Sequence, residues 1–74
     1  MDKLDFYKEV NHNLTGLIAV ETDPVANLAN ASALLFERMT EINWAGFYLM
    51  KAGELVLGPF QGKPACIRIA LGKG

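Results

Sequence analysis

The sequence contains very few residues that could cross-link a small protein through a disulfide or a metal ion. It has one cysteine and one histidine in 74 residues, so it cannot form an internal disulfide and offers a poor site for a metal, which leads us to expect none. A chain of this length buries only about 60% of the surface that it would expose when unfolded. Yet 51% of the residues are hydrophobic. This excess predicts burial against a partner, such as a second copy in a homodimer, or membership of a larger domain.

The sequence also lacks an excess of basic charge and a long apolar run. Seven basic and eight acidic side chains give a net charge of −1, which argues against a nucleic-acid-binding surface, because such a surface needs a basic stripe. No apolar run approaches the roughly 20 residues of a membrane-spanning helix. The charged start MDKLDFYKEV is unlike a signal peptide. We therefore expect a cytoplasmic protein that binds neither nucleic acid nor membranes.

Two segments with the periodicity of amphipathic helices come first. Apolar residues recur at steps of three and four over about residues 2–18, and Asp2 is placed to cap this helix. Asp23 followed by Pro24 is a strong start signal, because a capping side chain precedes a proline at the first helical position. The pattern predicts a second helix from residue 24 to about residue 41.

From Asn43 onward the hydrophobic period changes to two, which predicts strands. NWAGFYLM forms the first predicted strand, ELVLGPF the second and ACIRIAL, residues 65–71, the third. The intervening KAGE predicts a hairpin turn in which Gly53 supplies a positive φ. Pro59 predicts that the second strand ends at a sheet edge or a bulge. The order of elements predicts an α+β fold with two helices followed by a three-stranded antiparallel sheet.

Trp44 and Tyr48 share one face of the first predicted strand, with Gly46 between them. Their α-carbons are expected roughly 13 Å apart, and two aromatic walls around an empty floor would suit a small ligand with an apolar end. Core packing, in which Gly46 lets a helix approach, fits the same pattern. Arg68 could meet a carboxylate ligand or pair with a surface acid. Cys66 is open to two interpretations, a buried structural thiol or a redox thiol.

The segments LLFERMTEINWAGFYLM, LVLGPFQGKPACIRI and the terminal GKG resemble the free methionine-(R)-sulfoxide reductases, which are built on a GAF domain. The resemblance covers the whole chain, and it matches about the first half of such a protein. It therefore implies that residues 1–74 are the N-terminal part of a single GAF domain, truncated after the third strand.

The resemblance also implies a chemistry. In this family a cysteine thiolate attacks the sulfur of free L-methionine (R)-S-oxide, methionine leaves, and the sulfenic acid condenses with a second cysteine to a disulfide that thioredoxin reduces, with no bound cofactor. Cys66 matches the resolving thiol, and Trp44 and Tyr48 match residues around the methyl-sulfoxide end of the substrate. The family's nucleophile lies beyond GKG, so we expect this chain alone to be inactive. The alternative is a non-catalytic GAF-type module that binds a small molecule or acts as a sensor.

Overall fold

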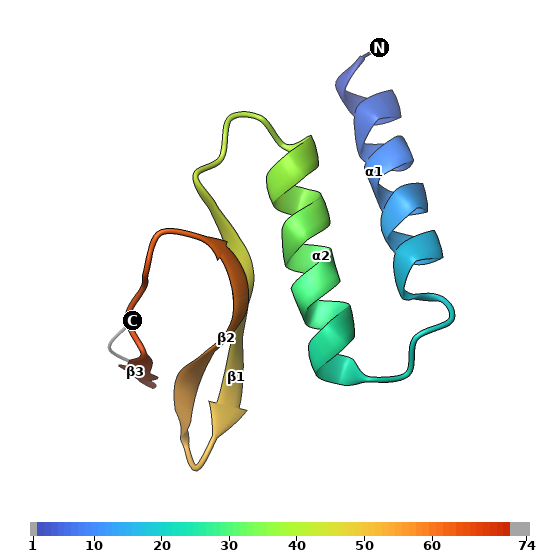
Figure 1. Cartoon of the computed structure of the whole chain (residues 1–74). Helices are drawn as coiled ribbons and strands as arrows, with labels where there is room; N and C mark the ends of the chain where they lie inside the picture. Colours follow the sequence, from blue (N-terminus) through green and yellow to red (C-terminus); the bar gives the residue numbers. More distant parts are fainter. Residues whose placement is uncertain (1, 72–74) are drawn as a thin grey trace.

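The computed structural model describes residues 2–71 as two helices followed by three strands (Figure 1). The elements are α1 (Lys3–Ile18), α2 (Pro24–Arg38), β1 (Trp44–Lys51), β2 (Glu54–Gly62) and β3 (Arg68–Ala70). The strands form one antiparallel sheet in the order β1-β2-β3, so the predicted α+β fold is confirmed. Within the described range, no helix is both long and apolar enough to cross a membrane. The GKG segment used in the resemblance, residues 72–74, lies outside that range.

Both helices begin at the capping aspartates that the sequence predicts. A carboxylate oxygen of Asp2 accepts a hydrogen bond from the backbone N–H of Asp5 at 2.8 Å, and Asp23 accepts one from Ala26 at 2.8 Å. Pro24 occupies the first turn of α2, where its missing N–H would have had no helical partner. Each cap therefore satisfies a backbone donor that the helix itself leaves free.

The second helix ends at Arg38, so the predicted end at residue 41 is wrong. The backbone of Met39 is extended (φ −97°, ψ 95°). Thr40 and Ile42, which are β-branched and lose side-chain freedom in a helix, follow in the connection to β1. The chain reverses direction here so that β1 can lie along α2 (Figure 1). Tertiary packing thus ends the helix earlier in the chain than the hydrophobic pattern predicts.

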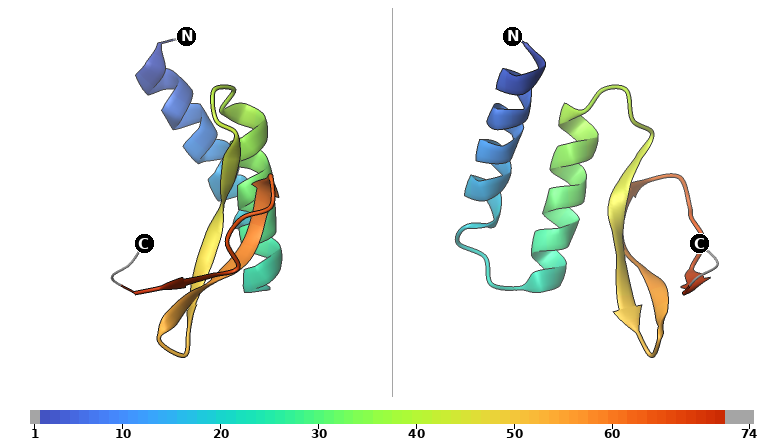
Figure 2. Two further views of the ribbon diagram at one scale, coloured as in Figure 1. Left: turned by 90° about the vertical axis from the view of Figure 1, so that its left-hand side faces the viewer. Right: turned by 180° about the vertical axis from the view of Figure 1, so that it is seen from behind.

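The elements form three layers in chain order. α2 packs against α1 on one side and against β1 and β2 on the other, as Figure 1 and the right-hand view of Figure 2 show. Ser32 of α2 is fully buried, and its hydroxyl lies 2.9 Å from the carbonyl oxygen of Leu28 and 3.1 Å from that of Pro59. This hydroxyl joins the helix layer to β2. Within residues 2–71 no helix packs on the opposite face of the sheet.

Much of the apolar stripe predicted on α1 remains uncovered in the described part of the chain. Val10 is buried at 6% exposure, but Leu4 is 62% exposed and Tyr7 48%. Only the middle of the stripe therefore packs against α2. The small core is completed by Ala31, Ser32 and Ala45.

The hairpin of β1 and β2 is closed by a two-residue turn, Ala52-Gly53. Lys51 pairs with Glu54, and both turn residues have positive φ, 50° for Ala52 and 82° for Gly53. Two positive φ values define a type I′ turn, whose twist matches that of the flanking strands. The predicted positive φ at Gly53 is confirmed.

A β-bulge interrupts this hairpin. The register shifts between Gly46 and Tyr48, so that Phe47 lies opposite two residues of β2, Gly58 and Pro59. The prediction of a bulge at Pro59 is confirmed. The predicted strand ends at Phe60, whereas β2 continues to Gly62, two residues further.

The third strand is shorter than predicted. It begins at Arg68 rather than at Ala65 and pairs with the first three residues of β2. One further bond follows, in which the N–H of Leu57 donates to the carbonyl of Ile67 at 2.8 Å. Beyond it β2 bulges at Pro59, which has no N–H to donate. The ladder therefore stops before the cysteine, which lies in the loop between β2 and β3.

We predict that replacing Ala52 with asparagine stabilises the chain. A left-handed conformation costs an ordinary L-residue roughly 1–2 kcal/mol, and asparagine tolerates it better. Urea unfolding followed by circular dichroism should give a higher midpoint for Ala52→Asn than for the parent chain. Ala52→Val, which is β-branched, is the matched control and should lower the midpoint. An asparagine variant that unfolds at the same or a lower urea concentration would contradict the assigned turn.

Candidate functional site

Trp44, Tyr48 and Phe60 form an aromatic cluster on one face of the sheet. The ring centroids of Trp44 and Tyr48 are 6.2 Å apart, with 26° between the ring planes. Those of Trp44 and Phe60 are 5.5 Å apart, with 16° between the planes. Phe60 is not among the residues that the sequence pattern predicts at this site. The signal that could have found it is the hairpin register, which places Phe60 opposite Gly46.

The indole ring of Trp44 lies over Gly46, so the empty floor expected between the two aromatic walls is filled. A Cβ added at Gly46 would lie 2.8 Å from Cη2 of Trp44 and 2.3 Å from Cβ of Phe60. Both distances are shorter than a van der Waals contact, so a residue with a side chain cannot replace Gly46 without displacing its neighbours. Gly46 therefore admits two aromatic side chains rather than a helix.

The aromatic cluster faces away from α2. Successive side chains of a strand point to opposite faces of the sheet. Ala45, which lies between Trp44 and Gly46, is only 9% exposed, and α2 is the helix that packs against β1. Ala45 therefore points toward α2, and the cluster occupies the other face.

The cluster contains one unsatisfied polar group. The indole nitrogen of Trp44 is shielded from solvent and has no hydrogen-bond partner among the described residues. The five-membered ring is bordered by Gly62, where an added Cβ would lie 2.9 Å from Cδ1. A buried donor without an acceptor costs about 1–3 kcal/mol. The aromatic cluster therefore holds an N–H group that an acceptor would stabilise.

Cys66 is a free and exposed thiol, so the interpretation as a buried structural cysteine does not hold. The phenolic hydroxyl of Tyr48 donates a hydrogen bond to the carbonyl oxygen of Cys66 at 2.7 Å. This bond crosses β2 and brings together two of the residues that the sequence predicts to be functional. Sequence spacing could not reveal it, because the two residues are 18 positions apart.

Arg68 is engaged in a surface ion pair. Its Nη1 lies 2.6 Å from Oε1 of Glu54, and the side chain of Arg68 is 61% exposed. Exposed pairs of this kind contribute about 0–1 kcal/mol. Of the two alternatives given for Arg68, the structure therefore favours the surface pair.

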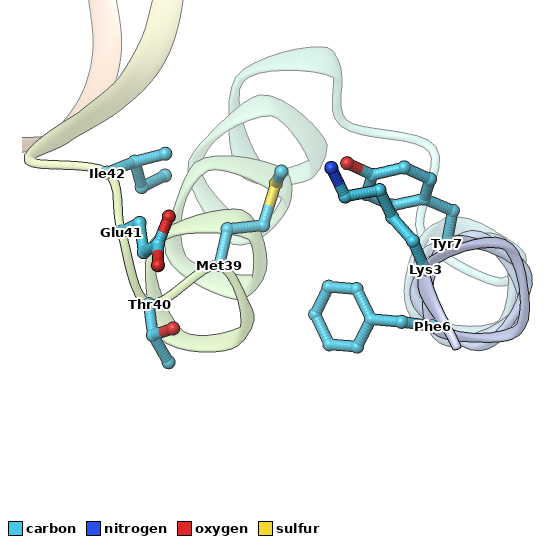
Figure 3. A pocket seen from close by; sticks show the side chains of 7 residues that line it. All are labelled: Lys3, Phe6, Tyr7, Met39, Thr40, Glu41 and Ile42. Carbon is cyan, nitrogen blue, oxygen red and sulfur yellow. The ribbon is translucent and has the colours of Figure 1, made fainter. Parts of the chain in front are cut away.

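A cavity of about 520 Å³ lies elsewhere, between α1 and the connection after α2 (Figure 3). Lys3, Phe6 and Tyr7 line it from α1, and the segment 39–42 lines it from the other side. It shares no residue with the aromatic cluster or with Cys66. In residues 2–71 no group of three or more histidine, cysteine, aspartate or glutamate side chains is placed to hold a metal ion.

No protein-family model matches the chain. The chain is 58% identical over 74 residues to the free methionine-R-sulfoxide reductase of Escherichia coli (strain K12), an alignment that covers 100% of this chain and 45% of the relative. The X-ray structure of free methionine-R-sulfoxide reductase from Neisseria meningitidis in complex with its substrate matches with a TM-score of 0.92 and 49% identity. Over its whole length the chain is therefore similar to part of the free methionine-R-sulfoxide reductases.

Two further matches give the fold and the extent of this similarity. A GAF protein from Burkholderia vietnamiensis matches with a TM-score of 0.95 and 50% identity, covering 100% of this chain and 47% of that one, which confirms the GAF fold. The Neisseria reductase is matched over 45% of its length and over all of this chain. The chain therefore spans less than half the length of the relatives that it matches.

We predict that replacing Gly46 with alanine destabilises the chain, because the new methyl group overlaps Phe60 and Trp44. Overpacking of this kind costs typically 1–3 kcal/mol. Thermal unfolding should show a lower midpoint, and tryptophan fluorescence should change because the single tryptophan moves. Gly16→Ala in α1 is the control, since nothing lies within 4 Å of its added Cβ. It should raise stability by roughly 0.5–1 kcal/mol. Equal effects of the two substitutions would refute the close approach at Gly46.

Proposed function

We propose that the chain is the N-terminal part of a single GAF domain that reduces free L-methionine (R)-S-oxide to L-methionine by thiol chemistry. The observation that carries this proposal is the hydrogen bond from the hydroxyl of Tyr48 to the backbone carbonyl of Cys66, which links the exposed cysteine to the aromatic cluster. The 58% identity to the Escherichia coli reductase supports it.

In the proposed reaction Cys66 is the resolving thiol. A nucleophilic cysteine, which this chain does not contain, attacks the sulfoxide sulfur; methionine leaves and that cysteine becomes a sulfenic acid. The sulfur of Cys66 then attacks the sulfenic sulfur, the S–S bond forms, and the hydroxyl departs with the thiol proton as water. Thioredoxin supplies the two electrons that reduce the disulfide. The exposure of Cys66 is what this second step needs, because both the other cysteine and the reductant must reach the disulfide.

The aromatic cluster is the proposed binding site for the methyl-sulfoxide end of the substrate. Its rings offer apolar surface to the methyl group, and the N–H of Trp44, which is shielded from solvent in the structure, could donate to a substrate oxygen only after the indole shifts. Because Trp44 and Tyr48 contact each other in the structure, a substrate must lie against the exposed side of the pair rather than between the rings.

The chain by itself is proposed to be inactive, because its sequence holds one cysteine and the reaction requires at least two. No bound cofactor takes part, and the thioredoxin system of the cytoplasm is the proposed reductant. The alternative function is a non-catalytic GAF-type module that binds or senses a small molecule. The unpartnered N–H of Trp44 within an aromatic cluster favours it, because this feature serves ligand binding without any thiol.

The role of Cys66 can be tested in a chimera that joins this chain to the C-terminal part of the Escherichia coli relative. We predict that Cys66→Ser leaves the first chemical step intact, because the nucleophile lies elsewhere. A single turnover followed by rapid quench should still yield one methionine per enzyme. Thioredoxin-coupled oxidation of NADPH should then be slow, because thioredoxin attacks disulfides and none forms.

Two outcomes would contradict this role. Loss of the first-turnover methionine in Cys66→Ser would make Cys66 the nucleophile. If Cys66→Ser changes neither the single-turnover yield of methionine nor the steady-state rate of NADPH oxidation, Cys66 has no redox role. A parent chimera that binds the sulfoxide but never reduces it would support the sensor alternative.

Trp44→Ala should act on a different step of the same chimera. It removes an aromatic wall of the proposed binding site, so it should weaken substrate binding or orientation before any covalent step. We predict a loss of about 10- to 200-fold in kcat/KM, the range for one methylene-sized contact in an apolar pocket. Phe36→Ala on the exposed surface of α2 is the control and should leave kcat/KM unchanged. Equal kcat/KM for Trp44→Ala and the parent would exclude the cluster as the substrate site.

A further inference from the structure

Tyr48 makes two separate interactions, a ring stack and a side-chain hydrogen bond, and no other residue of the described chain makes both. Its ring stacks against Trp44 in the aromatic cluster, with centroids 6.2 Å apart. Its hydroxyl reaches across β2 to the carbonyl of Cys66, at 2.7 Å. The hydroxyl of Tyr48 therefore binds the cysteine loop, while its ring packs within the aromatic cluster.

The backbone at Cys66 is held on one side only. The carbonyl of Cys66 is bonded to Tyr48, and the next carbonyl, that of Ile67, accepts the N–H of Leu57 at 2.8 Å. The preceding residues 63–65 make no hydrogen bond with other parts of residues 2–71. Two successive carbonyls thus fix the chain just after the thiol. The first of these anchors is a side chain, and a substitution can remove it without touching the β-ladder.

We propose that Tyr48 is a positioning residue for Cys66, whose hydroxyl fixes the backbone from which the thiol extends. The catalytic consequence rests on the proposed function, in which Cys66 must form a disulfide. Disulfide formation requires α-carbons about 4.4–6.8 Å apart and a narrow torsion range. A cysteine at the end of an untethered glycine- and proline-containing loop meets that geometry only part of the time. By anchoring the carbonyl of Cys66, the hydroxyl of Tyr48 restricts the movement of the loop. It thereby raises the fraction of time during which Cys66 has the geometry that a disulfide requires.

The first test is made on the 74-residue chain and does not require any enzymatic activity. Tyr48→Phe removes the hydroxyl and keeps the ring that stacks against Trp44. Hydrogen–deuterium exchange in a peptide covering residues 62–69 should become about 2- to 10-fold faster, which is the population change expected from losing one net hydrogen bond. Tyr7→Phe is the matched control. Its hydroxyl lies on α1, away from the cysteine loop, and its removal should leave exchange in this peptide unchanged.

The second test uses the chimera with the Escherichia coli C-terminal part. Because Tyr48 also lies in the proposed binding site, the methionine formed in a single turnover of Tyr48→Phe is measured first, and disulfide formation is then expressed per methionine formed. The disulfide should then form about 2- to 10-fold more slowly than in the parent chimera. Its rate is measured by rapid quenching with a reagent that alkylates free thiols. A merely structural role would instead lower the thermal midpoint and reduce both steps together.

The outcomes separate this proposal from the proposed function. Unchanged exchange in residues 62–69 overturns the positioning role, whatever the chimera does. Faster exchange with an unchanged rate of disulfide formation also overturns it. Faster exchange together with slower disulfide formation supports it. If the parent chimera fails to reduce the sulfoxide, the proposed function fails, and the exchange measurement alone still decides whether Tyr48 fixes the loop.

Discussion

The close approach of β1 and β2 at Gly46 is the constraint on which the candidate site depends. Because this position has no Cβ, Phe60 can lie directly opposite it and the indole of Trp44 can lie over it. The indole in turn contacts the ring of Tyr48, whose hydroxyl reaches the loop that carries Cys66. The missing Cβ therefore sets the positions of three aromatic rings, and through the hydroxyl of Tyr48 it sets the position of the backbone carbonyl of Cys66, beyond β2.

The features that the sequence predicts correctly are those decided by local chemistry. The caps at Asp2 and Asp23 follow from a carboxylate one residue before a helix, and the turn at Gly53 follows from the need for positive φ. The bulge at Pro59 follows from a missing N–H. Each of these involves residues within a few positions of one another. The residues that determine each of these features therefore lie within a short stretch of sequence, so the features can be predicted without knowledge of the tertiary structure.

The features that the sequence does not predict depend on residues far apart in the chain. The helix α2 stops at Arg38 because the chain must turn back along it, and β3 starts at Arg68 because the partner strand bulges. The contact between Tyr48 and Cys66 requires the order and register of three strands. Alternation along β1 correctly placed Trp44 and Tyr48 on one face, but it carries no information on rotamers. For this reason the expected gap between the rings was not found.

The three-layer arrangement has a consequence for how this chain acquires its structure. Each element of the described range packs only against its neighbour or next neighbour in the chain: α1 with α2, α2 with β1 and β2, and the strands with one another in order. Contacts between elements close in sequence require little loop-closure entropy, and chains rich in them fold quickly. During synthesis the helix pair and then the hairpin can therefore form as they leave the ribosome. The cysteine loop can then close onto a hairpin in which Tyr48 is already in place to bond its backbone.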